Sequence, residues 1–390
     1  MREGFKIYDT DTHIGPSAET IRPYLSSVVL ERVPDLEEHR TPIRMSVTRE
    51  ALQPPYRHSY RFRGGSEEGA GFGIDHARFL GEAAPREQKV ERPRQFMGTR
   101  FPTHGCDDDS AEARLRDMDD EGVDAHFMIG GAGASHPDPV VGLEFMRAGH
   151  RYLDDFSGQD PHRLKASISV VPWAIEESIQ EIKRWAPSPW AVAIHPHLPV
   201  GYPLDHPDLD PIWAAAQEHG LAVIHHSFSA RYPGHRDLWD NPFLGRLAAH
   251  PWGAMRAVGA FFGAGIMDRF PAIRFGILES GFGWLPFWAR RMDDQVVYMG
   301  YVNEHLECKM SEYLTGGRFF ASVVLHEGEE MVKMVTEDLG DHILTFSSDY
   351  PHPESRFPGS ADIALAWTSL GEDRMRKLLW ENPVRFFGEP

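Results

Sequence analysis

Cysteine is nearly absent from this chain, which has only Cys106 and Cys308 among 390 residues. Two widely separated cysteines provide neither a disulfide framework nor a CxxC metal site. The chain also lacks the apolar N-terminal segment of a signal peptide, and no stretch approaches 18 uninterrupted apolar residues. We therefore expect a soluble, cytoplasmic protein with no membrane partner.

Positive charge is scarce as well, with 40 lysine and arginine residues against 58 acidic residues and a net charge of -18. No basic stripe is available to neutralise phosphates, so a nucleic-acid partner is excluded. No GxGxxG motif follows the first apolar segment, so a dinucleotide site lacks support. We expect a small-molecule substrate instead.

Among the residues that are abundant, histidine stands out with 21 copies. The first apolar segment, residues 6–13, ends with Asp9, Asp11 and His13 at alternate positions. Alternate residues of an extended strand share a face, so these side chains could point into one cavity. A carboxylate and an imidazole at a strand end suit a divalent metal. The alternative is an ordinary strand end that enters a turn at Gly15.

Short apolar segments alternate with helical segments along most of the chain. The predicted strands are 6–13, 123–129, 164–171, 191–195, 221–226, 273–279, 318–324 and 342–349. This alternation indicates a parallel sheet, and eight units favour a (β/α)8 TIM-type barrel over an open doubly wound sheet. We predict a single barrel domain over residues 1–390. Residues 17–105 form an irregular insertion within it that covers the active site or contacts a neighbouring subunit.

Polar residues gather at the predicted carboxyl ends of the strands, where the active site of such a barrel lies. Buried charges at these positions need partners, and a metal ion supplies one. The residues concerned are Asp11, His13, His195, His197, His225, His226, Glu279, Asp349 and His352.

Four motifs carry a resemblance to a known family. They are Asp-Thr-Asp-Thr-His at 9–13, Val-Ile-His-His at 223–226, the segment 269–281, and Ser-Ser-Asp-Tyr-Pro-His at 347–352. In this order they resemble the amidohydrolase superfamily, in the branch of aminocarboxymuconate-semialdehyde decarboxylase. The likeness covers residues 5–16 and 120–388. It implies a metal-dependent barrel of hydrolases and non-oxidative decarboxylases, and from it we expect a homodimer.

The resemblance also implies a ligand set for one divalent metal ion, either Zn or Mn. Asp11 stands where the family has the first histidine of its His-x-His pattern, and His13 matches the second. His225 matches the ligand of the fifth strand, and Asp349 matches the aspartate of the eighth. We expect strand alternation to turn His226 away from the site.

Catalytic and substrate-binding residues are predicted around these ligands. Glu279 stands where the family has a catalytic histidine, and it serves either as general base or as a further ligand. Asp349 and His195 are the other catalytic candidates, and Asp9 is expected to orient a ligand or the backbone. Candidates for substrate binding are His197, Arg231, Arg256, Trp284 and His352.

Two reactions fit this set of residues. In a hydrolase, the metal would activate water and Glu279 or Asp349 would accept its proton. In a decarboxylase of an aromatic or enoic carboxylic acid, Glu279 would deliver a proton to carbon, which requires a raised pKa that the metal's charge opposes. This argument favours hydrolysis, with decarboxylation as the alternative. A third possibility is an inactive barrel that binds a ligand or partner.

Overall fold

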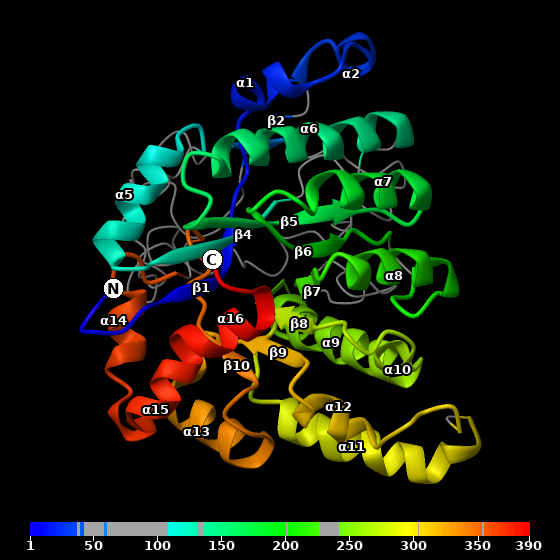
Figure 1. Cartoon of the computed structure of the whole chain (residues 1–390), viewed down its shortest axis with the longest axis vertical. Helices are drawn as coiled ribbons and strands as arrows, with labels where there is room; N and C mark the ends of the chain where they lie inside the picture. Colours follow the sequence, from blue (N-terminus) through cyan, green and yellow to red (C-terminus); the bar gives the residue numbers. More distant parts are fainter. Residues whose placement is uncertain are drawn as a thin grey trace, which may run out of the picture.

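Eight parallel strands form one sheet at the centre of the molecule (Figure 1). Their order in the sheet follows their order in the chain. After the last strand, the chain returns to the first: Thr12 pairs with Tyr350 as an isolated parallel bridge, and Thr10 N donates to Phe346 O. The strands are β1 (Tyr8–His13), β4 (Ala125–Ile129), β5 (Leu164–Val170), β6 (Ala191–Pro196), β7 (Ala222–His226), β8 (Phe275–Leu278), β9 (Phe319–Ser322) and β10 (Leu344–Thr345).

The structure is a computed structural model, and the residues it describes are 1–36, 40–42, 58–60, 108–130, 136, 138–199, 202–226, 242–302, 304–352 and 355–390. The sheet and its helices confirm the predicted (β/α)8 TIM-type barrel. The predicted strand 342–349 pairs as a strand only over Leu344–Thr345. Residues 346–349 form the loop that crosses back to β1.

Helices separate the successive strands and cover the outside of the barrel (Figure 1). Several begin at polar caps: the Ser110 hydroxyl accepts from Ala113 N, and an Asp138 oxygen accepts from Val140 N. The helices between strands are α5 (Ala111–Glu121), α6 (Pro139–Ser157), α7 (Ile175–Trp185), α8 (Asp210–Glu218), α9 (Pro242–Gly263), α10 (Ile266–Arg269), α11 (Leu285–Met299), α12 (Met310–Thr315) and α13 (Gly328–Leu339). After β10 come α14 (Ser360–Leu365), α15 (Gly371–Arg376) and α16 (Asn382–Phe387).

The segment after β1 begins with two short helices, α1 (Ala18–Ile21) and α2 (Ser27–Arg32). It also contains a small antiparallel pair, β2 (Arg40–Pro42) with β3 (His58–Tyr60). The rest of the predicted insertion lies outside the described residues. Its role as a cover or subunit contact therefore stays a prediction. Among the described residues, no helix combines the length and the apolar character needed to cross a membrane.

Aromatic residues from the C-terminal helix fill part of the barrel interior. Phe386 and Phe387 of α16 are buried in one cluster with strand residues such as Phe127 and Phe320. Phe387 stacks on Phe127 with ring centroids 4.1 Å apart, and Phe386 stacks on Phe320 at 4.7 Å. Gly276 of β8 leaves the space that Phe386 occupies, because a Cβ there would lie 2.2 Å from the Phe386 ring.

We expect Gly276→Ala to destabilise the fold by about 1–3 kcal/mol, because the added methyl group forces Phe386 out of its packed position. Urea unfolding followed by circular dichroism measures the change. Gly149→Ala in α6 is the matched control, since nothing lies within 4 Å of the new methyl group there. Equal stabilities for the two variants would show that Phe386 does not constrain β8.

Candidate metal centre

Ligand-type side chains from four parts of the barrel meet at the carboxyl ends of the strands. Asp11 and His13 come from β1, and His226 is the last residue of β7. Glu279 directly follows β8. The loop after β10 supplies Asp349 and His352. Donor atoms of His13, Glu279, Asp349 and His352 all lie within 4.8 Å of one another, as do those of Asp11, His13 and His226.

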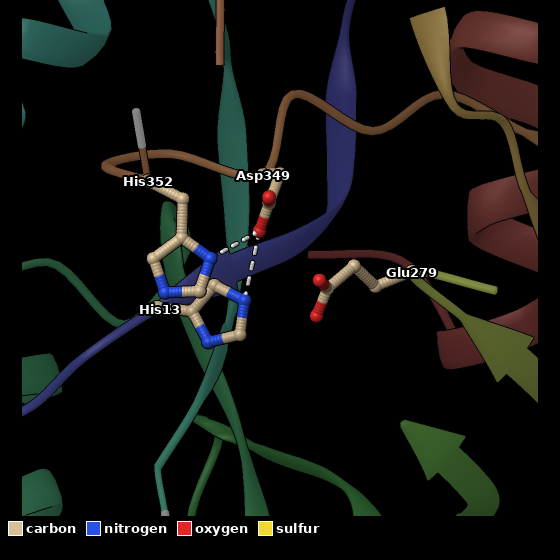
Figure 2. A group of neighbouring side chains, drawn as sticks. All are labelled: His13, Glu279, Asp349 and His352. Carbon is tan, nitrogen blue, oxygen red and sulfur yellow. Dashed lines mark ion pairs between the residues drawn. The ribbon is translucent and has the colours of Figure 1, made fainter. Parts of the chain in front are cut away.

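Asp349 lies between two imidazoles (Figure 2). Its Oδ1 is 2.9 Å from His13 Nε2 and 2.9 Å from His352 Nδ1. The two imidazole rings stack with centroids 3.9 Å apart. The carboxylate of Glu279 approaches the group from the other side (Figure 2), with its Oε2 3.0 Å from His226 Nε2.

The donor atoms are spaced as ligands of one ion would be. Two ligands that are each about 2.1 Å from a metal, at angles between 90° and 109°, lie roughly 3.0–3.4 Å apart. Asp11 Oδ1 lies 3.7 Å from His13 Nε2 and 3.6 Å from His226 Nε2, distances only slightly longer than this ligand-to-ligand spacing.

Hydrogen bonding supports the same conclusion. Asp11 and Asp349 have four carboxylate oxygens between them, and all four are buried. Within the described residues, none of the four receives a hydrogen bond of good geometry. Buried oxygens in that state are costly unless a cation binds them. The residues present therefore fit one divalent metal ion, in agreement with the expected cofactor.

Three carboxylates share this small buried space, and their charges interact. Burial raises the pKa of Asp11 well above its ordinary value, and the charges of Asp349 and Glu279 raise it further. Burial also raises the pKa of Glu279, but its contacts with His226 and His250 outweigh this and leave the pKa below its ordinary value. An additional cation would relieve this crowding of negative charge.

The imidazoles of the cluster are affected in opposite directions. Burial, together with the charge of His352, lowers the pKa of His13 to about 4. Burial lowers the pKa of His226 too, but the Glu279 and Asp11 carboxylates overcome it and raise the value to about 9. Neutral His13 thus has a lone pair available for a metal, as ligation requires.

Two of the carboxylate residues have left-handed backbone conformations, which are rare for residues other than glycine. Glu279 has φ of 50° and Asp349 has φ of 62°. Hydrogen bonds hold both turns: Glu279 N donates to the Ser322 hydroxyl, and Asp349 N donates to Asp11 O. The strands therefore end in sharp turns that bring both carboxylates to the barrel mouth.

The structure places His226, rather than His225, in the donor cluster. Ala222, Ile224 and His226 alternate along β7, and the first two belong to the interior cluster that contains Phe386. His225 is buried on the other face of the strand with Val223. The expectation that His226 turns away is therefore wrong. The even-numbered residues of β7 face the barrel interior, whereas the prediction had assigned the odd-numbered residues to that face.

Asp9 also differs from the simple alternation pattern. The pairing of β1 with β4 shifts by one residue between Asp9 and Thr12, which is a β-bulge. Asp9 is consequently absent from the donor groups, and its Oδ1 accepts from Asp11 N and Ser348 N. The carboxylate thus ties β1 to the loop after β10, in agreement with the expected backbone-orienting role.

The histidines at the end of β6 border the cluster. The His195 ring lies 4.2 Å from the His197 ring and 6.2 Å from the His226 ring, between centroids. Burial, followed by the charge of His197, holds the pKa of His195 well below its ordinary value. The His197 Nε2 is 3.1 Å from the Ser169 hydroxyl. Both histidines are placed to contact a molecule that enters the mouth, and their roles stay predictions.

His250 is a neighbour of Glu279 that sequence reasoning missed. Its Nδ1 donates to the Glu279 backbone oxygen at 3.0 Å and lies 3.4 Å from Glu279 Oε1. His250 belongs to α9, which follows a different strand from Glu279. No local sequence signal marks this contact, because it arises only when the helix packs on the barrel.

The remaining predicted residues are spread more widely. Arg231 lies outside the described residues. Arg256 is exposed on α9 and is not among the residues gathered around the donor cluster. Trp284 precedes α11, where its Nε1 donates to Ser280 O at 3.1 Å. That bond ties Trp284 to the loop that carries Glu279, and substrate contact stays a prediction for it.

Comparison with known proteins places the chain in a family. No curated protein matches the sequence. The family model described as amidohydrolase matches residues 107–388, which is more than half of the chain. The chain belongs to the amidohydrolase family.

Solved structures share the fold of this amidohydrolase. The amidohydrolase map2389c from Mycobacterium avium subsp. paratuberculosis K-10 is similar with a TM-score of 0.71 and 15% identity, over 99% of this chain and 100% of that one. The 5-carboxyvanillate decarboxylase from Novosphingobium aromaticivorans DSM 12444, complexed with manganese and 4-hydroxy-3-methoxy-5-nitrobenzoic acid, has a TM-score of 0.65 and 18% identity, over 99% and 97%. The 2,6-dihydroxybenzoate decarboxylase from Rhizobium has a TM-score of 0.61 and 18% identity, over 70% of this chain and 87% of that one.

We expect His226→Ala to lose most of the bound divalent metal, whereas His225→Ala retains it. Of the two histidines at the end of β7, His226 presents its ring to Asp11, so its removal takes a donor from the cluster and leaves the carboxylates poorly compensated. Elemental analysis of the purified variants measures the metal per chain. Loss of metal from the His225 variant alone would show that the other face of β7 carries the ligand.

We expect His250→Ala to weaken Mn²⁺ binding by about tenfold, because it removes the backbone contact that holds the turn of Glu279 beside the donor atoms. His250→Asn should retain affinity, because an asparagine amide can donate from nearly the position of Nδ1, whereas His250→Gln should not. Isothermal titration with Mn²⁺ measures the affinities. His305→Ala is the control, since that ring contacts the Gly263 backbone oxygen instead. Equal affinities for the Asn and Gln variants would contradict the proposed contact.

Proposed function

We propose that this amidohydrolase is a metal-dependent, non-oxidative decarboxylase of an aromatic carboxylic acid. The observation that carries the proposal is the pairing of a carboxylate-rich donor cluster with a full-length likeness to a decarboxylase. That decarboxylase has bound manganese and a nitrobenzoic acid, and it matches 99% of this chain. Hydrolysis, favoured by the sequence, becomes the second candidate.

The metal would be held by Asp11, His13, His226 and Asp349. Two of these four ligands are carboxylates, and oxygen ligands favour Mn over softer metals. We therefore propose Mn rather than Zn as the resident ion. When bound, the ion would hold the substrate carboxylate and a neighbouring oxygen and offset their negative charge.

Decarboxylation of an aromatic acid exchanges a carboxylate for a hydrogen. The ring carbon gains a proton, the bond from that carbon to the carboxylate breaks, its electron pair returns to the ring, and CO₂ leaves. The protein must therefore carry one proton to the carbon. Glu279 lies at the mouth beside the donor cluster, and we propose that it carries this proton.

His250 and Ser322 hold the backbone of Glu279, which directs its carboxylate towards the mouth. His195 at the end of β6 and His197 just after it are placed to orient the aromatic acid. Contacts with His226 and His250 lower the pKa of Glu279, so we propose that its carboxylate first takes the proton from a water molecule in the mouth and then passes it to the carbon. An ionised carboxylate is also a general base, and this observation favours hydrolysis as the second candidate.

We expect the Mn²⁺-loaded protein to release CO₂ from a hydroxylated benzoic acid. The test uses a panel that includes 5-carboxyvanillate and 2,6-dihydroxybenzoate, in ²H₂O, with mass spectrometry of the products. One deuterium should appear on the carbon that lost the carboxylate. Glu279→Gln should keep its metal and lose a factor of about 10² to 10⁴ in rate, because a carboxamide cannot carry the proton.

The His226→Ala variant is the control for metal dependence. Incorporation of ¹⁸O from water into a product carboxylate, without CO₂ release, would establish hydrolysis instead. Full activity in Glu279→Gln would assign the proton transfer to Asp349 or to a histidine of the mouth.

A further inference from the structure

The buried face of α5 is largely charged. Five residues of this helix are buried, and three of them are Arg114, Asp117 and Glu121. They are spaced three and four residues apart, so they lie along one side of the helix. A helix usually packs through apolar side chains, and a buried charge is costly unless it has a partner. The contacts of these three residues therefore show what this face of α5 holds.

Two of the three residues hold segments that follow the last strand. An Asp117 carboxylate oxygen accepts a hydrogen bond from the Tyr350 hydroxyl, and Glu121 Oε1 accepts one from Ser360 N at 2.9 Å. Tyr350 directly follows Asp349 in the chain, and Ser360 begins α14. The acidic residues of this face are thus attached to the chain where it leaves the metal centre.

Arg114 holds the carboxyl end of β1, and its side chain is fully buried. Its Nη1 donates to His13 O at 2.9 Å, and its Nη2 donates to the Thr12 hydroxyl at 2.9 Å. Nη1 also donates to Asp108 Oδ1 at 3.1 Å, and the second oxygen of Asp108 accepts from Gly15 N at 2.7 Å. The buried ion pair of Arg114 with Asp108 therefore holds the backbone on both sides of His13.

The guanidinium of Arg114 also contacts the segment after Asp349. Its Cζ lies 5.0 Å from the centroid of the Tyr350 ring, which is a cation–π distance. The Tyr350 backbone oxygen accepts a hydrogen bond from His13 N at 2.7 Å. The two segments that carry His13 and Asp349 therefore meet here, with the two side chains facing each other (Figure 2). Arg114 contacts both segments.

These contacts require the shape of an arginine as well as its charge. A guanidinium is a planar fork whose separate nitrogens can donate to several acceptors at once, whereas lysine has a single ammonium nitrogen. Arg114 uses both of its terminal nitrogens, and its face lies against a ring. One of its acceptors is the backbone oxygen of His13. A displaced guanidinium would therefore leave the end of β1, which carries Asp11 and His13, less firmly held.

We propose that Arg114 is a positioning residue of the metal centre, which holds His13 and Asp349 at the separation that one ion requires. It acts through the His13 backbone and the Tyr350 ring, and it is not itself a ligand. The proposal rests on the metal centre of the proposed function, but not on which of the two reactions that centre catalyses.

The test is the Mn²⁺ affinity of Arg114→Lys, measured by isothermal titration. The dissociation constant should rise by about 10- to 100-fold, the range typical of losing a group that orients metal ligands. The electron paramagnetic resonance spectrum of bound Mn²⁺ should also change, because it depends on the arrangement of the ligands around the ion.

Arg163→Lys is the matched control. Arg163 also donates to two backbone oxygens, those of Val123 and Asp124, but both residues precede β4, at the opposite end of the barrel from the metal centre. This variant should lower the stability measured by urea unfolding and leave the Mn²⁺ affinity and the spectrum unchanged. The comparison separates positioning of the ligands from general stabilisation.

Thr12→Val is the second variant, should Arg114→Lys fail to fold. It removes the hydroxyl that accepts from Nη2 while nearly conserving volume, and it should raise the dissociation constant by about tenfold. Thr12→Ser keeps the hydroxyl and should restore the wild-type affinity.

Wild-type affinity in both Arg114→Lys and Thr12→Val overturns the proposal. An equal loss of affinity in Arg163→Lys also overturns it, because destabilisation alone would then be the cause. A wild type that binds no Mn²⁺ removes the metal centre and this proposal with it. A wild type that binds Mn²⁺ but converts no aromatic acid removes only the decarboxylase, and the loss of affinity in Arg114→Lys would still support the positioning role.

Discussion

Charge compensation in a buried site is the constraint on which the mouth of the barrel depends. Asp11, Glu279 and Asp349 lie close together; the side chain of Asp11 is buried, and those of Glu279 and Asp349 are only 13% and 14% exposed. Removing a single carboxylate from water costs several kcal/mol, and neighbouring negative charges add to that cost. The imidazoles of His13 and His226 offset part of it, and a divalent cation is the natural source of the rest. The donor side chains must therefore be held close together, although they come from the ends of β1, β7 and β8 and from the loop after β10.

The backbone conformation that maintains this arrangement has a cost in conformational free energy. Left-handed conformations at Glu279 and Asp349 cost of order 1–3 kcal/mol each, and they persist because other contacts determine them. Ser322 and His250 fix the two peptide groups of Glu279, while the backbone of Asp11 fixes that of Asp349. β1, which carries the donor residues Asp11 and His13, thus also shapes the turn that carries Asp349.

Sequence reasoning predicted the barrel because its signals are local. The apolar periodicity of α5, α6 and α7, together with the N-caps Ser110 and Asp138 of the first two, marks each helix within its own residues. The error at β7 has a different origin. Both faces of a strand in a parallel barrel are buried. The apolar character of Ala222, Ile224 and Val223 therefore does not reveal which of them face the barrel interior. The bulge in β1 and the approach of His250 to Glu279 depend on tertiary packing, which leaves no mark in the neighbouring sequence.

The packing of α16 into the barrel has a consequence for biosynthesis. Phe386 and Phe387 fill interior space that strands from the beginning of the chain enclose, and Asp9 accepts a hydrogen bond from Ser348 across 339 positions. Such distant contacts form late, since the intervening chain must first be ordered. On the ribosome, Asp11 and His13 emerge long before Asp349. The complete donor set therefore exists only once nearly all of the polypeptide has been translated, so metal loading follows synthesis rather than guiding the first steps of folding.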